Sequence, residues 1–169
     1  FVERFTSDGL LDTSFGDGGR TALADVPASV ACDSHGDILV GWTNSFGVVP
    51  DSTCLAMLDA SGHLVSGFGQ GGTVNTHVDG WSFSLAFDAS DRPLLAVASH
   101  GDVGFELLRI GADGSTTGTF AQVSGQEQVS GIDMLADGGI LVAGTTWANG
   151  EGQFAYAAFT ANGGHDGAF

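Results

Sequence analysis

The stretch FVERFTSDGLLDTSFGDGG, residues 1–19, decides the fold because the chain repeats its pattern three more times. The related stretches are CLAMLDASGHLVSGFGQGG from Cys54, FELLRIGADGSTTGTF from Phe105 and FAYAAFTANGGHDGAF from Phe154. Each is an apolar strand, a turn that ends in glycine, and a linker that closes on phenylalanine six positions after that glycine. The turn glycines recur roughly every 50 residues, at Gly9, Gly62, Gly114 and Gly163. This regularity predicts an architecture of repeated units.

A second kind of block alternates with the first. It holds two short apolar strands separated by an Asp/Ser/Gly turn, which is typical of a β-hairpin. The three examples are ASVACDSHGDILVGWT from Ala28, FSLAFDASDRPLLAVAS from Phe83 and VSGIDMLADGGILVAGTT from Val129. Further strands are expected near residues 20–24, 73–76 and 120–123. One complete unit therefore has four short strands in about 50 residues, which is the size of one β-propeller blade.

Several of these strands are apolar without the strict alternation of a half-buried strand, as at residues 38–40 and 140–143. Such runs indicate sheets that are buried on both faces, as a blade between two neighbouring blades would be. No window has a 3.6-residue period and glycine interrupts every stretch, which argues against a helical fold. We therefore predict an all-β fold of β-propeller blades, each of four antiparallel strands, with about three blades in an incomplete ring.

Matching the blocks to the strand order of a blade predicts where each unit lies. Residues 1–25 are expected to form a half blade made of a third and a fourth strand. Residues 28–76 and 81–123 are each expected to form a whole blade, and residues 129–169 a blade that lacks its last strand. The chain also opens at Phe1 without Met or a recognisable leader, so we expect it to be a mature or trimmed piece of a longer protein.

An incomplete ring leaves blade faces and edge strands bare, and bare edges recruit other strands. Two arrangements would cover the bare faces and edges. Either neighbouring repeats of a longer chain cover the open ends, or copies of the chain associate through the open blade edges. Head-to-tail contacts of the second kind give a ring if they close and a filament if they do not.

The repeat resembles the delta-60 repeat, a bacterial repeat that forms β-propellers. VERFTSDGLLDTSFGDGG and GIDMLADGGILVAG look like the two halves of its pattern. The first unit matches the middle motif fully at residues 11–16, and later units keep little beyond the closing Phe. Arg4 and Arg109 match the strand arginine of the pattern, whereas Met57 and Ala158 depart from it.

The hairpin turn of that pattern, Asp-Gly, varies along the chain: it is intact at Asp137–Gly138, altered at His35–Gly36 and lost at Asp91–Arg92. The resemblance covers nearly the whole chain and implies a secreted or surface-displayed bacterial protein. It brings no catalytic residues to carry over. We therefore expect an extracellular or cell-surface location and no enzymatic activity.

The charge balance excludes some partners. The chain has 20 acidic residues against 4 arginines and no lysine, for a formal net charge of −16. Such a surface repels phosphate backbones, so nucleic acid and anionic membrane surfaces are poor partners. No run of about 18 apolar residues is present, so insertion into a bilayer is not expected.

Few residues suggest chemistry. Asp8, Asp12 and Asp17 lie in one glycine-rich stretch and are weak candidates for calcium ligands, because ordinary turn formation is the simpler explanation. Cys32 and Cys54 lie in apolar stretches and are either bridged or two buried free thiols. We predict no catalytic residues and, calcium apart, no cofactor.

Tryptophans at strand ends or loops are candidates for a carbohydrate-stacking platform, the alternative being packing between blades: Trp42, Trp81 and Trp147. The five histidines lie scattered among turns without the spacing of a zinc site. Two functions remain. The first is a non-enzymatic structural or binding module, and the second is a fragment of a propeller enzyme or lectin that acts on carbohydrate. Short loops rich in Gly and Ser favour the first.

Overall fold

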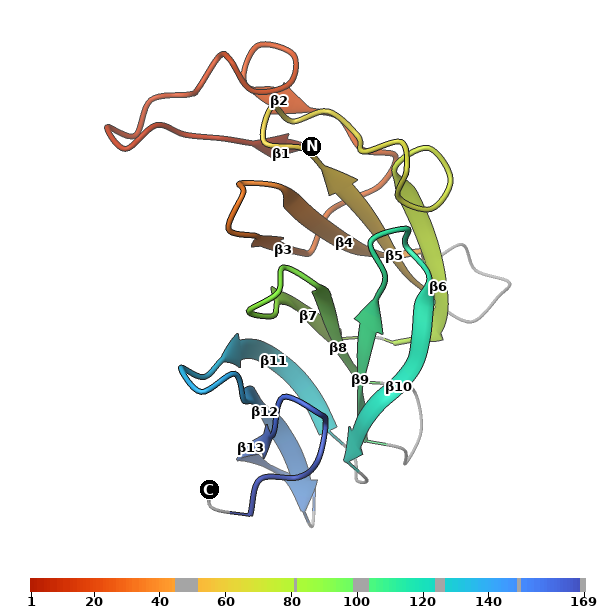
Figure 1. Cartoon of the computed structure of the whole chain (residues 1–169). Helices are drawn as coiled ribbons and strands as arrows, with labels where there is room; N and C mark the ends of the chain where they lie inside the picture. Colours follow the sequence, from red (N-terminus) through yellow and green to blue (C-terminus); the bar gives the residue numbers. More distant parts are fainter. Residues whose placement is uncertain (45–51, 81, 99–103, 124–126, 149, 168–169) are drawn as a thin grey trace.

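The computed structural model describes residues 1–44, 52–80, 82–98, 104–123, 127–148 and 150–167. Every regular element in these ranges is a β-strand, and the strands form four antiparallel sheets. The all-β fold predicted from the repeat is therefore confirmed. The described strands form no closed barrel. The sheets follow one another in an arc, with the two ends of the chain at opposite ends of the arc (Figure 1).

Each sheet follows the chain order. The leading pair consists of β1 (Val2–Glu3) and β2 (Arg20–Thr21). The first blade consists of β3 (Ser29–Cys32), β4 (Ile38–Asn44), β5 (Ser52–Leu58) and β6 (Thr73–Asp79). The second blade consists of β7 (Ser82–Phe87), β8 (Pro93–Ala98), β9 (Phe105–Ile110) and β10 (Thr116–Val123). The third blade consists of β11 (Glu127–Met134), β12 (Ile140–Ala148) and β13 (Glu151–Phe159).

Equivalent strands pair in equivalent registers. Ile38 of β4 lies opposite Leu58 of β5, just as Ile140 of β12 lies opposite Phe159 of β13. The two four-stranded sheets are simple meanders, in which each strand pairs with the next along the chain. These are propeller-type blades, and the ring that they form is incomplete.

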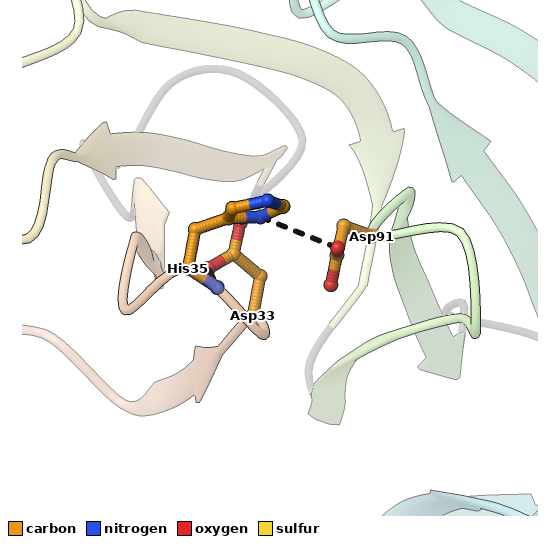
Figure 2. Close-up of side chains that lie close together, drawn as sticks. All are labelled: Asp33, His35 and Asp91. Carbon is orange, nitrogen blue, oxygen red and sulfur yellow. Dashed lines mark hydrogen bonds and ion pairs between the residues drawn. The ribbon is translucent and has the colours of Figure 1, made fainter.

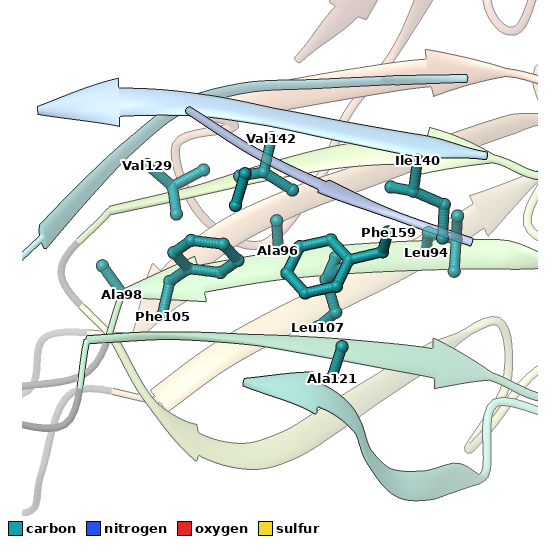
Figure 3. Packing of buried hydrophobic residues seen from close by; sticks show 11 residues of the cluster. Leu94, Ala96, Ala98, Phe105, Leu107, Ala121, Val129, Ile140, Val142 and Phe159 are labelled. Carbon is teal, nitrogen blue, oxygen red and sulfur yellow. The ribbon is translucent and has the colours of Figure 1, made fainter. Parts of the chain in front are cut away.

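The core lies between the sheets. In β4, Ile38 and Val40 pack toward the leading pair, while Leu39 between them packs toward the second blade. This two-sided burial explains why β4 is a continuous apolar run. The second and third blades bury a similar layer, in which the rings of Phe105 and Phe159 meet edge to face at 6.0 Å (Figure 3). Hydrophobic contact between neighbouring blades therefore holds the stack together.

Candidate functional site: the joints between repeats

Seven tight turns share one backbone geometry within the described ranges. In each, the first residue's N–H donates to the fifth residue's carbonyl, and the fourth residue's N–H donates to the first residue's carbonyl. The fourth residue always has a left-handed φ, between 54° and 87°, which glycine adopts without strain. These fourth residues are Gly9, Gly36, Gly62, Asp91, Gly114, Gly138 and Gly163. The repeat in the sequence is therefore a repeat of one turn.

The Asp-Gly dipeptide is missing at Asp91–Arg92, but the hairpin turn expected between the two apolar strands of this block is present. Asp91 occupies the glycine position of this turn with a φ of 54°. Its carboxylate accepts hydrogen bonds from the N–H of Ser34 at 2.9 Å and from Ser34 Oγ at 2.7 Å, in the equivalent turn of the preceding blade. These contacts between blades offset the cost of a left-handed non-glycine residue, about 1–2 kcal/mol.

A Phe-Gly pair of one repeat contacts the turn of the next repeat. The N–H of Gly16 donates to the carbonyl of Ser61 at 2.7 Å, and the N–H of Gly69 donates to that of Asp113 at 2.8 Å. A Cβ on the turn glycine Gly62 would lie 2.8 Å from the nitrogen of Gly16 and 2.8 Å from the ring of Phe15. Glycine is thus required here both by φ and by close approach. We call the contact between the aromatic linker of one repeat and the glycine turn of the next repeat a joint.

The strand arginine strengthens the first joint. Arg4 donates a hydrogen bond to the carbonyl of Ala60, in the turn of the next repeat, and its guanidinium lies 4.8 Å from the ring centroid of Phe15. Asp12 pairs with the same guanidinium at 2.8 Å. At the equivalent position in the first blade, Met57 packs in the apolar layer instead. The arginine is therefore an addition to the joint and not a condition for it.

The third joint keeps the arginine and the aromatic ring, but Ala121 stands where the other two linkers have glycine. Arg109 donates to the carbonyl of Ala161 at 2.7 Å and lies 4.0 Å from the ring centroid of Phe120. A Cβ on Gly163 would lie 2.6 Å from the carbonyl oxygen of Phe120. Three consecutive joints therefore place a turn glycine against the aromatic linker of the preceding repeat.

A second group of polar side chains lies between the first and second blades (Figure 2). Asp33 and His35 belong to the β3–β4 turn, and Asp91 belongs to the β7–β8 turn. His35 Nδ1 lies 3.3 Å from Asp91 Oδ2 and 3.7 Å from Asp33 Oδ2. One ligand atom from each residue lies within 4.8 Å of the other two, and no other group of three potential metal ligands exists among the described residues.

Sequence spacing does not reveal this group because Asp91 lies far along the chain from Asp33 and His35. Two signals in the sequence bear on it. Asp33 and His35 are two positions apart in one turn, and an aspartate stands at position 91 where the other six turns have glycine. Neither signal says that the two turns meet, because that contact depends on how the blades stack.

Asp88 is the one buried carboxylate among the described residues. Burial acts to raise its pKa, but hydrogen bonds from the Arg92 side chain and from the N–H groups of Ser90 and Arg92 outweigh burial. The pKa of Asp88 therefore lies below its ordinary value of 3.8. The carboxylate is committed to its own turn and to Arg92, so it is not available as a catalytic base.

We expect Asp88→Asn to destabilise the fold at neutral pH by about 2 kcal/mol, because charged hydrogen bonds are lost. A carboxyl whose pKa is lowered by folding stabilises the fold above its unfolded pKa, and this contribution vanishes as the pH falls through its folded pKa. The gap in unfolding free energy between the wild type and the variant should thus narrow below about pH 4. Urea unfolding across the pH range measures it. A gap that stays constant with pH would contradict this account.

The candidate calcium ligands are not brought together. Asp12 accepts hydrogen bonds from Arg4 and from the N–H and Oγ of Ser14, and the Ser14 hydrogen bonds are the largest contribution to its lowered pKa. Asp8 and Asp17 are exposed on separate turns. Asp12 therefore acts inside the first joint, which agrees with the turn-forming alternative.

The candidate stacking residues lie apart. Trp42 is 7% exposed and packs with Cys54 in the first blade, so it belongs to the core. Trp147 is 49% exposed on β12 of the third blade, and Trp81 lies outside the described residues. Both cysteines are free; Cys54 is buried as expected, but Cys32 is exposed, which corrects the expectation for that residue. Cys32 is exposed because it lies at the end of β3, where no sheet among the described residues covers it.

The two ends of the stack expose large apolar side chains. We define the N-terminal end face by Phe1, Phe5 and Val30, and the C-terminal end face by Trp147, Phe154 and Tyr156. Val30 is 59% exposed, whereas Leu85, at the equivalent place in the second blade, is 5% exposed because the first blade covers it. The end faces are therefore blade surfaces that no sheet among the described residues covers.

The chain matches no known protein family and no curated protein in sequence comparisons. Within the described residues, no helix is long and apolar enough to span a membrane.

Proposed function

We propose that this chain is a non-enzymatic structural or binding module of a secreted or cell-surface bacterial repeat protein, of the kind that the delta-60 resemblance implies, and that its copies associate head to tail. The observation that carries the proposal is the joint. It occurs three times within the chain, and its receiving turn occurs once more, at Gly9, where a Cβ would meet nothing within 4 Å. A fourth joint therefore has room to form there.

The free edge of β1 supports the same conclusion. The third strands of the two complete blades, β5 and β9, pair with a neighbour on each side, whereas β1 pairs only with β2 among the described strands. A groove of about 540 Å³ runs beside β1, and its lining includes Val30, Ile38 and Val40 of the first blade. Apolar strands of another repeat would fill this groove and cover the edge.

The C-terminal end face offers the matching half of a head-to-tail contact. Phe154 and Tyr156 alternate with Ala157 and Phe159, which face the second blade, so the two aromatic side chains face outward. Their rings contact each other at 6.0 Å and are 77% and 56% exposed. An exposed apolar patch of this kind marks an interaction surface. Because the two end faces differ, their contact is heterologous and leads to a ring or a filament.

The acidic side chains support the non-enzymatic part of the proposal. Asp33, Asp59 and Asp88 each accept hydrogen bonds from two N–H groups of their own turn, as turn-forming aspartates do. In all three, the Oδ1 atom is engaged by the turn. They do not form the converging pair that hydrolysis of a glycosidic bond requires.

We expect Val30→Asp to weaken self-association about tenfold or more, because a charge would have to be buried on the N-terminal end face. Phe154→Asp should do the same from the C-terminal end face. Val26→Asp is the matched control, since Val26 is 79% exposed and does not line the groove. Sedimentation velocity over a wide range of concentration measures the effect.

Mixing the two variants sharpens the test. Each keeps the end face that the other has lost, so an equimolar mixture of Val30→Asp and Phe154→Asp should form dimers and stop there, while each variant alone stays monomeric. A wild type that remains monomeric at every concentration would sink the proposed association. Equal association of wild type and variants would show that other surfaces are responsible.

A further inference from the structure

We propose that Asp33, His35 and Asp91 form a binding site for a divalent transition-metal ion, with Zn²⁺ as the probe, at the contact between the first and second blades. The proposal does not depend on self-association, because all three residues belong to one chain. It assigns a ligand to a group that sequence spacing does not reveal. The site draws on two separate turns, so metal binding would link the two blades (Figure 2).

The separations of the ligand atoms carry the argument. Zn²⁺ binds imidazole nitrogen and carboxylate oxygen at about 2.0–2.2 Å in tetrahedral geometry, so neighbouring ligand atoms lie roughly 3.3–3.5 Å apart. His35 Nδ1 is 3.3 Å from Asp91 Oδ2 and 3.7 Å from Asp33 Oδ2. Both separations already approximate the edge of such a tetrahedron. The exposed imidazole of His35 is free to rotate toward the two carboxylates.

The two carboxylates are held in place by bonds that leave them able to bind a metal. Asp33 Oδ1 accepts from the N–H groups of His35 and Asp37 at 2.8 Å, and Asp33 Oδ2 is the atom directed at the imidazole. Asp91 Oδ1 accepts from the N–H of Ser34, and Asp91 Oδ2 accepts from Ser34 Oγ and keeps a second lone pair for a metal. Ligating carboxylates in metal sites are fixed by outer hydrogen bonds in this way. The outer contacts therefore exist before any metal binds.

The exposure of the three side chains fits a site that solvent reaches. Asp33 is 9% exposed, Asp91 is 28% exposed and His35 is 74% exposed. The open side beyond the imidazole has room for water as a fourth ligand. The two carboxylates neutralise a divalent charge, and the formal net charge of −16 favours cations over the whole surface.

The donor set selects the class of metal. One nitrogen and two oxygens suit zinc and similar transition metals, whereas Ca²⁺ takes six to eight oxygens and Mg²⁺ requires an octahedron of oxygens. Calcium and magnesium are therefore negative probes. Zn²⁺ should also raise the melting temperature, because a ligand that binds the folded state alone stabilises it.

The test uses the whole chain after treatment with a chelator, titrated with ZnCl₂ by isothermal calorimetry. We expect one ion per chain, and affinity lower by about tenfold or more in His35→Ala and in Asp91→Gly. Asp91→Gly is informative because glycine suits the left-handed φ of 54°, so the turn is kept while the ligand is removed. Its thermal unfolding without zinc checks that it is folded.

His63→Ala is the matched control. His63 is 71% exposed and lies 3.8 Å from Asp59 in its own turn, but no third ligand joins this pair among the described residues. The variant should bind zinc as the wild type does and keep the zinc-dependent rise in melting temperature. The proposal is overturned if the wild type binds no Zn²⁺ at about 1 mM, or if His35→Ala or Asp91→Gly binds as tightly as the wild type.

Discussion

Replacing Gly62 by alanine is expected to lower the free energy of unfolding by about 3 kcal/mol or more. Two costs add. Gly62 has a φ of 86°, where an L-residue is strained by about 1–2 kcal/mol. The new Cβ would also lie 2.8 Å from both the nitrogen of Gly16 and the ring of Phe15, so the first joint has to open. Opening the joint would lengthen or break the 2.7 Å hydrogen bond from the N–H of Gly16 to the carbonyl of Ser61.

Gly9→Ala separates these two costs. Gly9 occupies the same position of an equivalent turn with a φ of 77°, but a Cβ there would meet nothing within 4 Å. Its substitution should therefore cost only the backbone strain, about 1–2 kcal/mol. The difference between the two variants, about 2 kcal/mol, measures the close approach within the joint.

Chemical unfolding of the wild type and both variants, treated as a two-state transition, gives the comparison. The slopes against denaturant should agree, so that the difference in midpoint reports stability. Equal losses at Gly9 and Gly62 would mean that the joint tolerates a side chain, and close approach would then play no part in holding neighbouring repeats together.

The joint also explains how much of the fold was readable in the sequence. The constant spacing from Gly62 to Phe68 predicted a repeated strand, turn and linker, because both residues meet strict local demands: a left-handed φ and complete burial. Continuous apolar runs such as β4 predicted two-sided burial. What the spacing did not reveal is the purpose of the pattern. The turn glycine of one repeat packs against the phenylalanine of the repeat before it. The spacing of residues within one repeat cannot predict such a contact, because the contact depends on how two repeats stack.

The sequence did not reveal the polar group of Asp33, His35 and Asp91 for the same reason: it depends on a contact between two blades. Asp91 departs from the glycine pattern, and local rules do not say what stabilises a non-glycine residue at this left-handed φ. Its compensation comes from Ser34, a residue of another blade. Exposure at the ends follows from the predicted incomplete ring, but the sequence pattern did not identify which apolar residues would be exposed. Cys32 and Val30 lie in a strand that reads as core, but the sheet that would cover them is not among the described residues.

The arginines show how such compensations vary from one joint to the next. Arg4 and Arg109 each donate a hydrogen bond to the turn of the following repeat. In the middle joint the equivalent residue is Met57, which packs in the apolar layer, so this joint forms without an arginine. The middle joint still keeps the hydrogen bond from Gly69 to Asp113. An aromatic linker packed against the turn of the next repeat is thus the constant part of a joint. The inter-repeat backbone hydrogen bond belongs to the first two joints, and the cation over the ring is a local addition worth about 0.5–1 kcal/mol at an exposed site.

If aromatic burial is a constant part, Phe68→Ala should be among the most damaging substitutions in the chain. Phe68 is 0% exposed and packs in the layer between the first and second blades with Leu55 and Leu108. Truncation removes the ring and leaves a cavity that the rigid turn around it cannot fill. The expected loss is about 3–5 kcal/mol. Because whole domains are stable by only about 5–15 kcal/mol, this is a large share.

Phe154→Ala is the matched control, since it makes the same chemical change at a side chain that is 77% exposed. It should change stability by less than about 0.5 kcal/mol. Both variants are compared with the wild type by thermal and denaturant unfolding at high dilution, where contacts through the C-terminal end face do not contribute. A loss of about 3–5 kcal/mol corresponds to a fall in melting temperature of roughly 10 °C for a chain of this size.

A third variant keeps the prediction testable if Phe68→Ala does not fold. Phe68→Leu retains most of the buried apolar volume and should cost about 1.5 kcal/mol or less. The three losses should then rank Phe68→Ala, Phe68→Leu, Phe154→Ala. The ranking follows from burial at the joint, because the linker's own backbone hydrogen bonds, from Phe68 to Val65 and from Gly72 to Phe68, are untouched by any of these changes. A Phe68→Ala variant as stable as Phe154→Ala would mean that blades adhere without their aromatic linkers.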